Sequence, residues 1–218
     1  MTVLRCAVVG MGFMGSTHAA AYVAAGRRGL PCELIAVVDR NESRWRGTAS
    51  GNIENDAEPL PDNVRGYAGL DELIEGDAVD LVSVCTPTDT HAEIVERLLR
   101  AGKHALCEKP VTLSSAAAHA LAAVEKETGR VCVPAMCVRY WPGYEPLIGA
   151  VRSGEFGALK SLSLSRKGAA PSWSPAYADA ARSGDALFDL HVHDADLVHY
   201  LLGKPAGVHA YGDTRRVS

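Results

Sequence analysis

The sequence contains no apolar run long enough to cross a membrane. Its longest apolar stretches are interrupted by Gly, Asp or Arg well before the roughly 20 residues that a transmembrane helix needs. The first residues, MTVLRCAVVGMGFMG, lack the polar region and small-residue cleavage site of a signal peptide. We therefore expect a soluble, cytoplasmic protein with no membrane partner.

An excess of basic residues and closely paired cysteines are also missing. The 22 Lys and Arg are outnumbered by 26 Asp and Glu, which gives a net charge of -4 and no basic stripe of the kind that nucleic-acid binders carry. The 6 cysteines include no CxxC pair, and most stand in apolar runs. We interpret them as buried free thiols in a reducing compartment, and we expect no nucleic-acid partner.

The length of 218 residues favours one full domain and a smaller second one. Up to residue 133, short β-branched runs alternate with helical patterns, which is typical of a parallel sheet covered on both faces. The predicted strands cover residues 3–9, 33–38, 80–85, 104–107 and 131–133. The predicted helices cover residues 16–26, 41–49, 70–75, 89–101 and 114–128, and a surface loop covers 50–66.

The pattern changes at Pro134, where we expect a second domain over residues 134–218 to begin. Its predicted elements are a short helix over 143–152, a strand over 159–166 with Leu at 159, 162 and 164, a loop over 168–182 and a long helix over 184–202. The predicted fold class is therefore α/β, with a doubly wound parallel sheet in residues 1–133 followed by an incomplete α+β domain.

A glycine-rich turn follows the first predicted strand. There, Gly10-x-Gly12-x-x-Gly15 leads into an Ala-rich helix. In a dinucleotide-binding fingerprint these glycines allow a tight turn, a close approach of the backbone to the pyrophosphate, and packing of the helix on the strand. The next predicted strand ends in Asp39, whose carboxylate can accept hydrogen bonds from ribose hydroxyls. We therefore predict a Rossmann domain that binds NAD or NADP.

The residues around Asp39 bear on the choice of cofactor. Asp39 would repel a 2'-phosphate, which favours NAD, whereas Arg40 could pair with that phosphate in NADP. Thr86 and Pro87 could border the nicotinamide ribose or form a plain turn, and His91 could instead be a capping or packing residue. The full predicted cofactor set is Gly10, Gly12, Phe13, Met14, Gly15, Asp39, Arg40, Thr86, Pro87, His91, Glu108 and Lys109.

Three further patterns stand where a substrate would meet the nicotinamide: Cys85-Thr86-Pro87-Thr88 with His91, then Glu108-Lys109-Pro110, and SGDALFDLHVHDAD over 183–196. With the glycine turn they resemble the Gfo/Idh/MocA family of NAD(P)-dependent sugar and polyol dehydrogenases, in order from Val3 to about Gly203. The resemblance implies an oxidoreductase that transfers a hydride between NAD(P) and a CH-OH group of a sugar, inositol or related polyol.

The family's catalytic or substrate-contacting groups correspond by match to Lys109, Asp189 and His193. Asp189 and His193 are four residues apart in one predicted helix, so we expect them on one face, together with Asp196. A histidine there suits removal of the hydroxyl proton. A lysine suits hydrogen bonding to the reacting oxygen. Because His191 and His193 would point to opposite sides of the helix, we expect no metal site.

The resemblance also implies a cis peptide bond between Lys109 and Pro110, and a place for Arg139 and Tyr140 in the substrate cleft. The predicted substrate-binding set is Lys109, Arg139, Asp189 and His193. An aromatic cluster of Tyr140, Trp141 and Tyr144 could equally belong to a core or an interface.

The chain departs from the family pattern in two respects. Ser183 precedes Gly184 where two glycines are usual, and His191 replaces a small or apolar residue. Family members also continue through several more strands, which complete a sheet that often forms the subunit interface. We therefore expect a C-terminally short member that forms a homo-oligomer if the full sheet is present. A non-catalytic NAD(P)-binding sensor or an inactive remnant remains an alternative. A methyltransferase is disfavoured because the Glu-Lys-Pro and D-x-x-x-H patterns have no role there.

Overall fold

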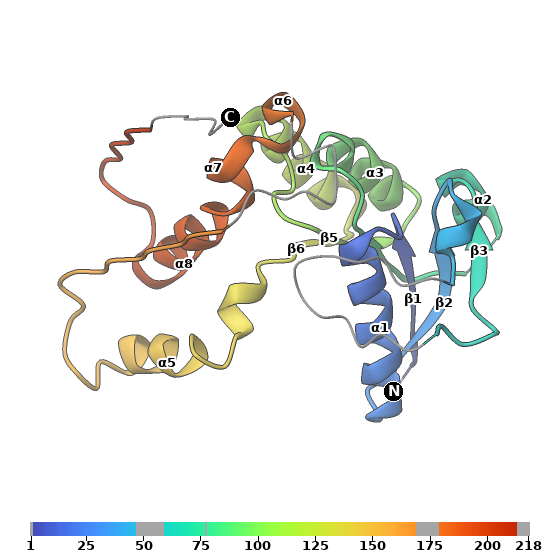
Figure 1. Cartoon of the computed structure of the whole chain (residues 1–218), viewed down its shortest axis with the longest axis horizontal. Coiled ribbons are helices and arrows are strands. Elements are labelled where there is room, and N and C mark those ends of the chain that lie inside the picture. Colours follow the sequence, from blue (N-terminus) through green and yellow to red (C-terminus); the bar gives the residue numbers. More distant parts are fainter. Residues whose placement is uncertain (1, 47–58, 77, 169–178, 213–218) are drawn as a thin grey trace. The chain divides into compact units, whose positions relative to one another are not determined.

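The computed structural model describes residues 2–46, 59–76, 78–168 and 179–212 (Figure 1). Its contacts divide the chain into two units. The first contains Met1–Ala135 with Lys167–Asp189, and the second contains Met136–Arg166 with Leu190–Ser218. Residues 167–189, which the sequence pattern assigned to the second domain, are thus grouped with the first unit.

The first unit is a six-stranded parallel sheet in the order β3-β2-β1-β4-β5-β6. Its strands are β1 (Leu4–Val9), β2 (Cys32–Val38), β3 (Arg65–Tyr67), β4 (Leu81–Val84), β5 (His104–Cys107) and β6 (Cys132–Pro134). The main helices are α1 (Phe13–Arg27), α2 (Leu70–Gly76), α3 (Thr88–Arg100) and α4 (Ser115–Thr128) (Figure 1). This is the predicted Rossmann fold, and the strand order reverses direction between β1 and β4, the usual ligand site of such sheets.

Both faces of the sheet are buried, which explains the nearly continuous apolar strands. Successive side chains of a strand point to opposite faces. Along β1, Ala7 and Val9 therefore pack in one core cluster with residues of α3 and α4, while Val8 packs in a second cluster with Ala19 of α1. Strands buried on both sides are typical of parallel sheets covered by helices.

The strands predicted for the first unit are present, as are its predicted helices apart from the one over 41–49, with shifts of a few residues at their ends. The three-residue strand β3 includes residues 65 and 66, which the sequence assigned to the loop over 50–66, so that end of the loop prediction is wrong. This strand escaped prediction because Arg-Gly-Tyr has no apolar run. In place of the helix expected over 41–49, the described part contains a short 3-10 helix, η1 (Glu42–Arg44). The rest of that prediction, 47–49, lies outside the described residues, as does most of the loops expected over 50–66 and 168–182.

Two short helices complete the first unit: α6 (Ala180–Ser183) and α7 (Asp185–Asp189). The guanidinium of Arg182 in α6 pairs with Asp89 in α3, with Nε 2.7 Å from Oδ2. The side chain of Asp89 has a lowered pKa because it accepts this hydrogen bond. This ion pair joins α6 to α3 of the Rossmann sheet.

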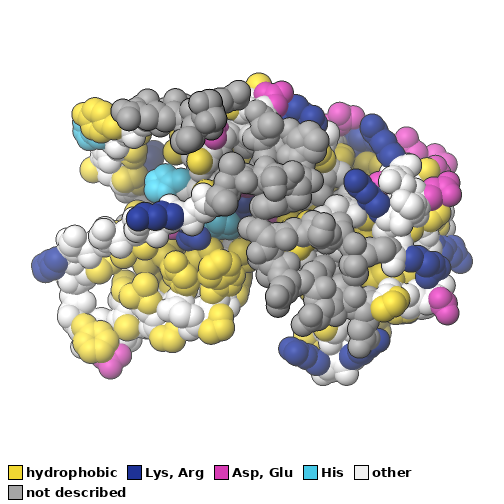
Figure 2. Space-filling view, viewed as in Figure 1, with side chains coloured by type: hydrophobic (Ala, Val, Ile, Leu, Met, Phe, Trp, Pro, Cys, Tyr) yellow, Lys and Arg dark blue, Asp and Glu magenta, His cyan; other side chains and the backbone are white. Residues whose placement is uncertain are grey.

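The second unit contains η2 (Cys137–Tyr140), α5 (Glu145–Ser153) and α8 (Val192–Leu202). Val138, Ile148 and Leu197 form its buried apolar centre. Hydrophobic side chains gather over the segment that carries η2 and α5, at the lower left of Figure 2. Tyr140 and Trp141, where η2 ends and before α5 begins, are exposed.

Two predictions for this part of the chain are wrong. Residues 159–166 form no strand, because no neighbouring strand pairs with them in the described part of the chain and an unpaired strand leaves its backbone groups without partners. The helix expected over 184–202 is divided into α7 and α8, with a turn at Leu190 and His191. None of the described helices is both long and apolar enough to span a membrane.

Candidate functional site

The glycine turn lies between β1 and α1. Gly10 has a φ of +88°, and a β-carbon there would meet the backbone of Cys85 after β4. A β-carbon on Gly15 would overlap the carbonyl oxygen of Gly10. By contrast, no described atom lies within 4 Å of a β-carbon placed on Gly12. Two of the glycines are thus required by packing, while Gly12 borders open space that a pyrophosphate can approach.

Helix α1 begins directly at this turn. None of the described side chains caps the helix at Gly12, and Phe13 and Met14, both half-buried, form its first residues. The first N–H groups of a helix have no acceptor within the helix and attract anions. The start of α1 can therefore bind the phosphates of a dinucleotide.

The carboxylate of Asp39 lies beside the same turn. Its Oδ2 accepts a hydrogen bond from the backbone N–H of Met11 at 2.9 Å, and its Oδ1 accepts one from Asn41 N–H at 2.9 Å. The nearest guanidinium is that of Arg44, whose Nη1 lies 3.8 Å from Oδ2, whereas Arg40 is exposed. The sequence pointed to Arg40 and missed Arg44, which η1 brings back toward the strand end.

Buried His91 connects the two turns that follow β4 and β5. Its Nε2 lies 2.7 Å from the carbonyl oxygen of Thr86, and its Nδ1 lies 2.9 Å from that of Pro110. Pro87, in the turn that follows β4, is the N-cap residue of α3. The structure gives His91 a bridging role, and the contacts of Thr86, Pro87 and His91 with a cofactor remain predictions.

Lys109 follows β5, and the bond between Lys109 and Pro110 is cis, as the sequence predicted. The Lys109 ammonium donates to Asp189 twice: Nζ lies 2.8 Å from Oδ1 and 2.7 Å from the main-chain carbonyl oxygen. Both side chains are less than one-fifth exposed. Two of the three predicted catalytic residues are thus brought together, and one of the three donors of the ammonium is left for a substrate oxygen by these two bonds.

The expectation that Asp189 and His193 share one helix face is wrong. In a continuous helix the Asp189 carbonyl would accept the N–H of His193, but it accepts the Lys109 ammonium instead, and His193 N–H lies 3.4 Å from the Leu190 carbonyl. Asp189 ends α7, and His193 belongs to α8 in the second unit, where it is buried.

Asp196 and Arg139 also belong to the second unit, where they form an ion pair. Arg139 Nε lies 2.7 Å from Asp196 Oδ2, and its guanidinium stacks on the ring of Tyr200 at 4.2 Å. Asp194 pairs in the same way with Arg166 at 2.8 Å. The predicted contacts of Arg139 and His193 with a substrate remain predictions.

Glu108, a predicted cofactor residue, belongs to a group of buried polar side chains at the Lys109 turn whose other members were missed from the sequence. Glu108 Oε1 lies 2.9 Å from His18 Nε2, and Glu108 Oε2 accepts the N–H of Lys109 at 3.1 Å. His18 Nδ1 lies 3.1 Å from Ser83 Oγ, which is 2.8 Å from the hydroxyl of Tyr22. The available signal was a polar residue inside an apolar run, such as Ser83 in LVSVC.

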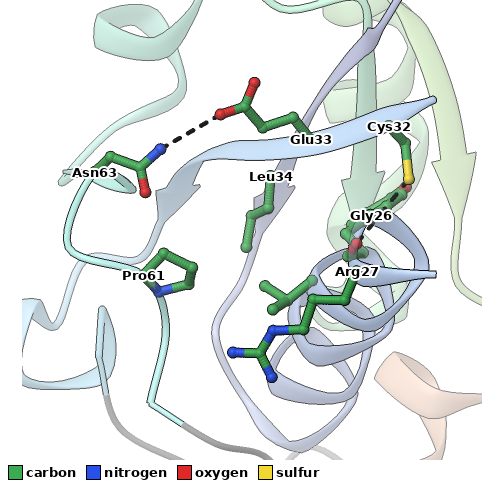
Figure 3. A pocket seen from close by; sticks show the side chains of 9 residues that line it. Gly26, Arg27, Cys32, Glu33, Leu34, Pro61 and Asn63 are labelled. Carbon is green, nitrogen blue, oxygen red and sulfur yellow. Dashed lines mark hydrogen bonds between the residues drawn. The ribbon is translucent and has the colours of Figure 1, made fainter. Parts of the chain in front are cut away.

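The described surface also has a pocket of about 180 Å³, shown in Figure 3. Its lining comes mainly from α1 and the first residues of β2: Tyr22, Val23, Gly26, Arg27, Cys32, Glu33, Leu34, Pro61 and Asn63. It therefore opens near the amino end of β2, whereas Asp39 follows the carboxyl end. We assign it no part in the candidate site.

Two family models match the chain. The one described as "Oxidoreductase family, NAD-binding Rossmann fold" matches residues 4–136, and the GFO/IDH/MocA C-terminal domain matches residues 146–218. The chain belongs to the Gfo/Idh/MocA family. The family assignment made from the glycine turn, the Glu-Lys-Pro turn and the D-x-x-x-H pattern is confirmed.

Curated relatives in this family include sugar and inositol dehydrogenases. The chain is 32% identical over 210 residues to UDP-N-acetylglucosamine 3-dehydrogenase of Acidithiobacillus ferrooxidans, covering 96% of this chain and 58% of the relative. It is 32% identical over 203 residues to scyllo-inositol 2-dehydrogenase (NAD(+)) of Bacillus subtilis, covering 92% and 54%. The chain thus spans about half the length of the curated relatives it matches.

Solved structures of similar proteins include complexes with NAD and with NADP. GenD2 from gentamicin A biosynthesis, in complex with NAD, has a TM-score of 0.72 at 30% identity, covering 94% of this chain and 55% of its own. A mutant of KijD10, a 3-ketoreductase from Actinomadura kijaniata in complex with TDP-benzene and NADP, has a TM-score of 0.69 at 26% identity, covering 93% and 58%. The first unit of this chain thus has the Rossmann fold of the family, and the relatives that bind NAD or NADP share it.

Proposed function

We propose that this chain is an NAD(P)-dependent dehydrogenase that acts on a CH-OH group of a sugar, inositol or related polyol. One observation carries the proposal: the glycine turn, the Asp39 carboxylate and Lys109, which pairs with Asp189, all follow the carboxyl ends of strands in one parallel sheet. In such sheets, ligands bind outside these strand ends. The dehydrogenase names of the relatives support the same substrate class.

Each residue of this group has a distinct part in the proposal. The turn at Gly10, Gly12 and Gly15 and the start of α1 hold the pyrophosphate, and Asp39 holds the adenosine ribose. The bound dinucleotide supplies the hydride acceptor or donor. Lys109 donates a hydrogen bond to the reacting oxygen and stabilises the negative charge that develops there. Asp189 orients the Lys109 ammonium through the two hydrogen bonds described above.

His193 is the proposed general base. An imidazole can take the hydroxyl proton as the hydride leaves the carbon, and return it in the reverse reaction. In this proposal Arg139 lines the substrate site. The free cysteines, of which Cys6 and Cys107 are buried, support a reducing, cytoplasmic location.

We propose NAD as the cofactor, with NADP as the alternative. The Asp39 carboxylate beside the turn disfavours a 2'-phosphate, while the nearby guanidinium of Arg44 would favour one. Relatives of known structure include both an NAD complex and an NADP complex. The relative affinity for NAD and NADP therefore depends on both Asp39 and Arg44.

The test combines cofactor titration with a substrate panel. NADH and NADPH binding is measured by calorimetry, and the chain is then incubated with NAD or NADP and a panel of polyols and aldoses while absorbance of the reduced cofactor is followed. The variant Lys109→Ala should abolish the signal, and its NADH affinity measures the cofactor contact predicted for Lys109. The exposed Lys126→Ala in α4 is the matched control. Binding without any Lys109-dependent turnover would favour a sensor or inactive remnant, and absence of binding would refute both.

A further inference from the structure

The backbone of Lys109 is connected to the dinucleotide helix by a buried set of hydrogen bonds. His18 lies in α1, six residues after the N-cap residue Gly12, and Glu108 precedes Lys109. The side chains of His18 and Glu108 are 13% and 10% exposed, and Ser83 of β4 is fully buried. Buried polar groups are costly unless they are hydrogen bonded, so this set has a defined arrangement.

The donors in this set can all point toward one acceptor, the Glu108 carboxylate. In the arrangement that we assign to these contacts, the Tyr22 hydroxyl donates to Ser83 Oγ, the Ser83 hydroxyl donates to His18 Nδ1, and His18 Nε2–H donates to Glu108 Oε1. A neutral histidine in a single tautomer satisfies both of its contacts in this way. The second carboxylate oxygen accepts the Lys109 N–H.

The electrostatics fit this direction. Burial by itself would raise the pKa of Glu108, but the hydrogen bond from His18 and the bond from the Lys109 backbone bring it below its ordinary value. Burial raises the pKa of Tyr22 to about 12. Near neutral pH, Glu108 is therefore an ionised acceptor and Tyr22 a protonated donor.

We propose that His18 is a positioning residue: it holds the Glu108 carboxylate against the Lys109 N–H and so fixes the Lys109 turn relative to the helix that receives the dinucleotide. The catalytic consequence rests on the proposed function, because Lys109 is the group that contacts the reacting oxygen. The hydrogen-bonding part does not, since it concerns the chain without cofactor. His91 contacts the same turn at a different residue, through the Pro110 carbonyl, so it does not replace the contact of His18 with Glu108.

Two substitutions separate the contacts of His18. Glutamine can place an amide nitrogen near the position of Nε2 and keep the bond to Glu108, whereas asparagine reaches only the position of Nδ1 beside Ser83. His119 is the matched control, because it is exposed on α4 and its Nδ1 contacts only the Ser115 carbonyl among the hydrogen bonds described. The variants are His18→Gln, His18→Asn and His119→Asn.

The first readout is amide exchange of Lys109 in the cofactor-free, isotope-labelled chain by NMR. We expect His18→Asn to speed exchange of the Lys109 amide about tenfold or more, His18→Gln to change it less than about threefold, and His119→Asn to leave it unchanged. Equal acceleration of the β1 and β4 amides would mean that His18 serves only global stability and would overturn the proposal, as would an unchanged Lys109 amide in His18→Asn.

The second readout is steady-state turnover with the polyol or aldose of the panel that gives the largest Lys109-dependent signal. We expect His18→Asn to lower kcat about tenfold or more with the KM for the dinucleotide within about threefold, and His18→Gln to restore most of kcat. A parallel rise in the KM of both variants with kcat unchanged would contradict positioning. If wild type binds no dinucleotide while the amide result holds, the proposed function is wrong and the His18–Glu108 contact still stands.

Discussion

The Lys109 ammonium donates a hydrogen bond to the main-chain carbonyl of Asp189. In an unbroken helix, this carbonyl would accept the N–H of His193. The same ammonium pairs with the Asp189 carboxylate at 2.8 Å. Asp189 therefore ends a helix and orients a cation at once. The turn at Leu190 and His191 accompanies the contact of Lys109 with the Asp189 carbonyl.

Replacing Asp189 with asparagine should separate these two contacts. The backbone bond to Lys109 is kept, but the charge that orients the ammonium is lost, so we expect kcat to fall about 100-fold with cofactor affinity within about threefold. Turnover kinetics and NADH titration measure the two quantities. Asp62→Asn, at a fully exposed carboxylate of the same unit, is the control. Unchanged kcat in Asp189→Asn would remove Asp189 from the proposed mechanism.

The three glycines of the turn should not be equivalent. Gly12→Ala meets open space and an extended backbone, so we expect its free energy of unfolding to change by less than about 1 kcal/mol while affinity for NADH falls about 100-fold. Gly15→Ala overlaps the Gly10 carbonyl and should lower the free energy of unfolding by about 3 kcal/mol.

Urea denaturation and calorimetry measure both effects. If Gly12→Ala bound NADH as tightly as wild type, the open space beside Gly12 would not be a pyrophosphate site. If Gly15→Ala were as stable as wild type, the close contact between α1 and the Gly10 carbonyl would be relieved at no cost.

Cofactor preference should depend on Asp39 and Arg44 together. In Asp39→Ser the carboxylate is gone and Arg44 becomes free to pair with a 2'-phosphate, so we expect NADPH binding to strengthen and NADH binding to weaken, each by about tenfold. The double variant Asp39→Ser/Arg44→Ala should lose the gain in NADPH affinity. If Asp39→Ser/Arg40→Ala keeps the gain in NADPH affinity, Arg44 is the cation that binds the 2'-phosphate. If this variant loses the gain, the cation is Arg40.

Much of the Rossmann unit could be predicted from local sequence. Strand β1, the glycine turn and the acid at the end of β2 stand within one short segment, and their periodicity and turn chemistry specify the same fold. The five strands predicted within residues 1–133 are all present, because both faces of the sheet demand apolar residues. β3 escaped prediction because an edge strand of three residues carries almost no periodic signal.

The errors share a physical cause, since each depends on contacts between residues distant in the chain. Residues 159–166 have strand-like leucines, but strand formation requires a partner. The division between α7 and α8 depends on Lys109, 80 residues away. The His18–Glu108 contact joins residues 90 positions apart, and no local pattern reports such a pairing.

Acid stability offers a test at the amino ends of the central strands β1 and β4, opposite the candidate site. Arg5 in β1 donates to Asp80 from its backbone N–H and from its guanidinium, with Nε 2.9 Å from Oδ2 and Nη2 2.8 Å from Oδ1. These bonds lower the pKa of Asp80 from its ordinary value of 3.8 to about 2. The ionised carboxylate is therefore more favourable in the folded state than in the unfolded one.

The sign of the pH dependence follows directly. Because the folded-state pKa is depressed, the stabilisation by Asp80 is complete above about pH 4 and disappears as pH falls toward 2. We expect the urea midpoint of wild type to exceed that of Asp80→Asn by a constant amount from pH 7 to pH 5, and the difference to shrink below pH 4. Asp62→Asn, at an exposed carboxylate, should follow wild type throughout. A difference between wild type and Asp80→Asn that is the same at pH 3 and pH 6 would mean that the bonds from Arg5 do not depend on the charge of Asp80.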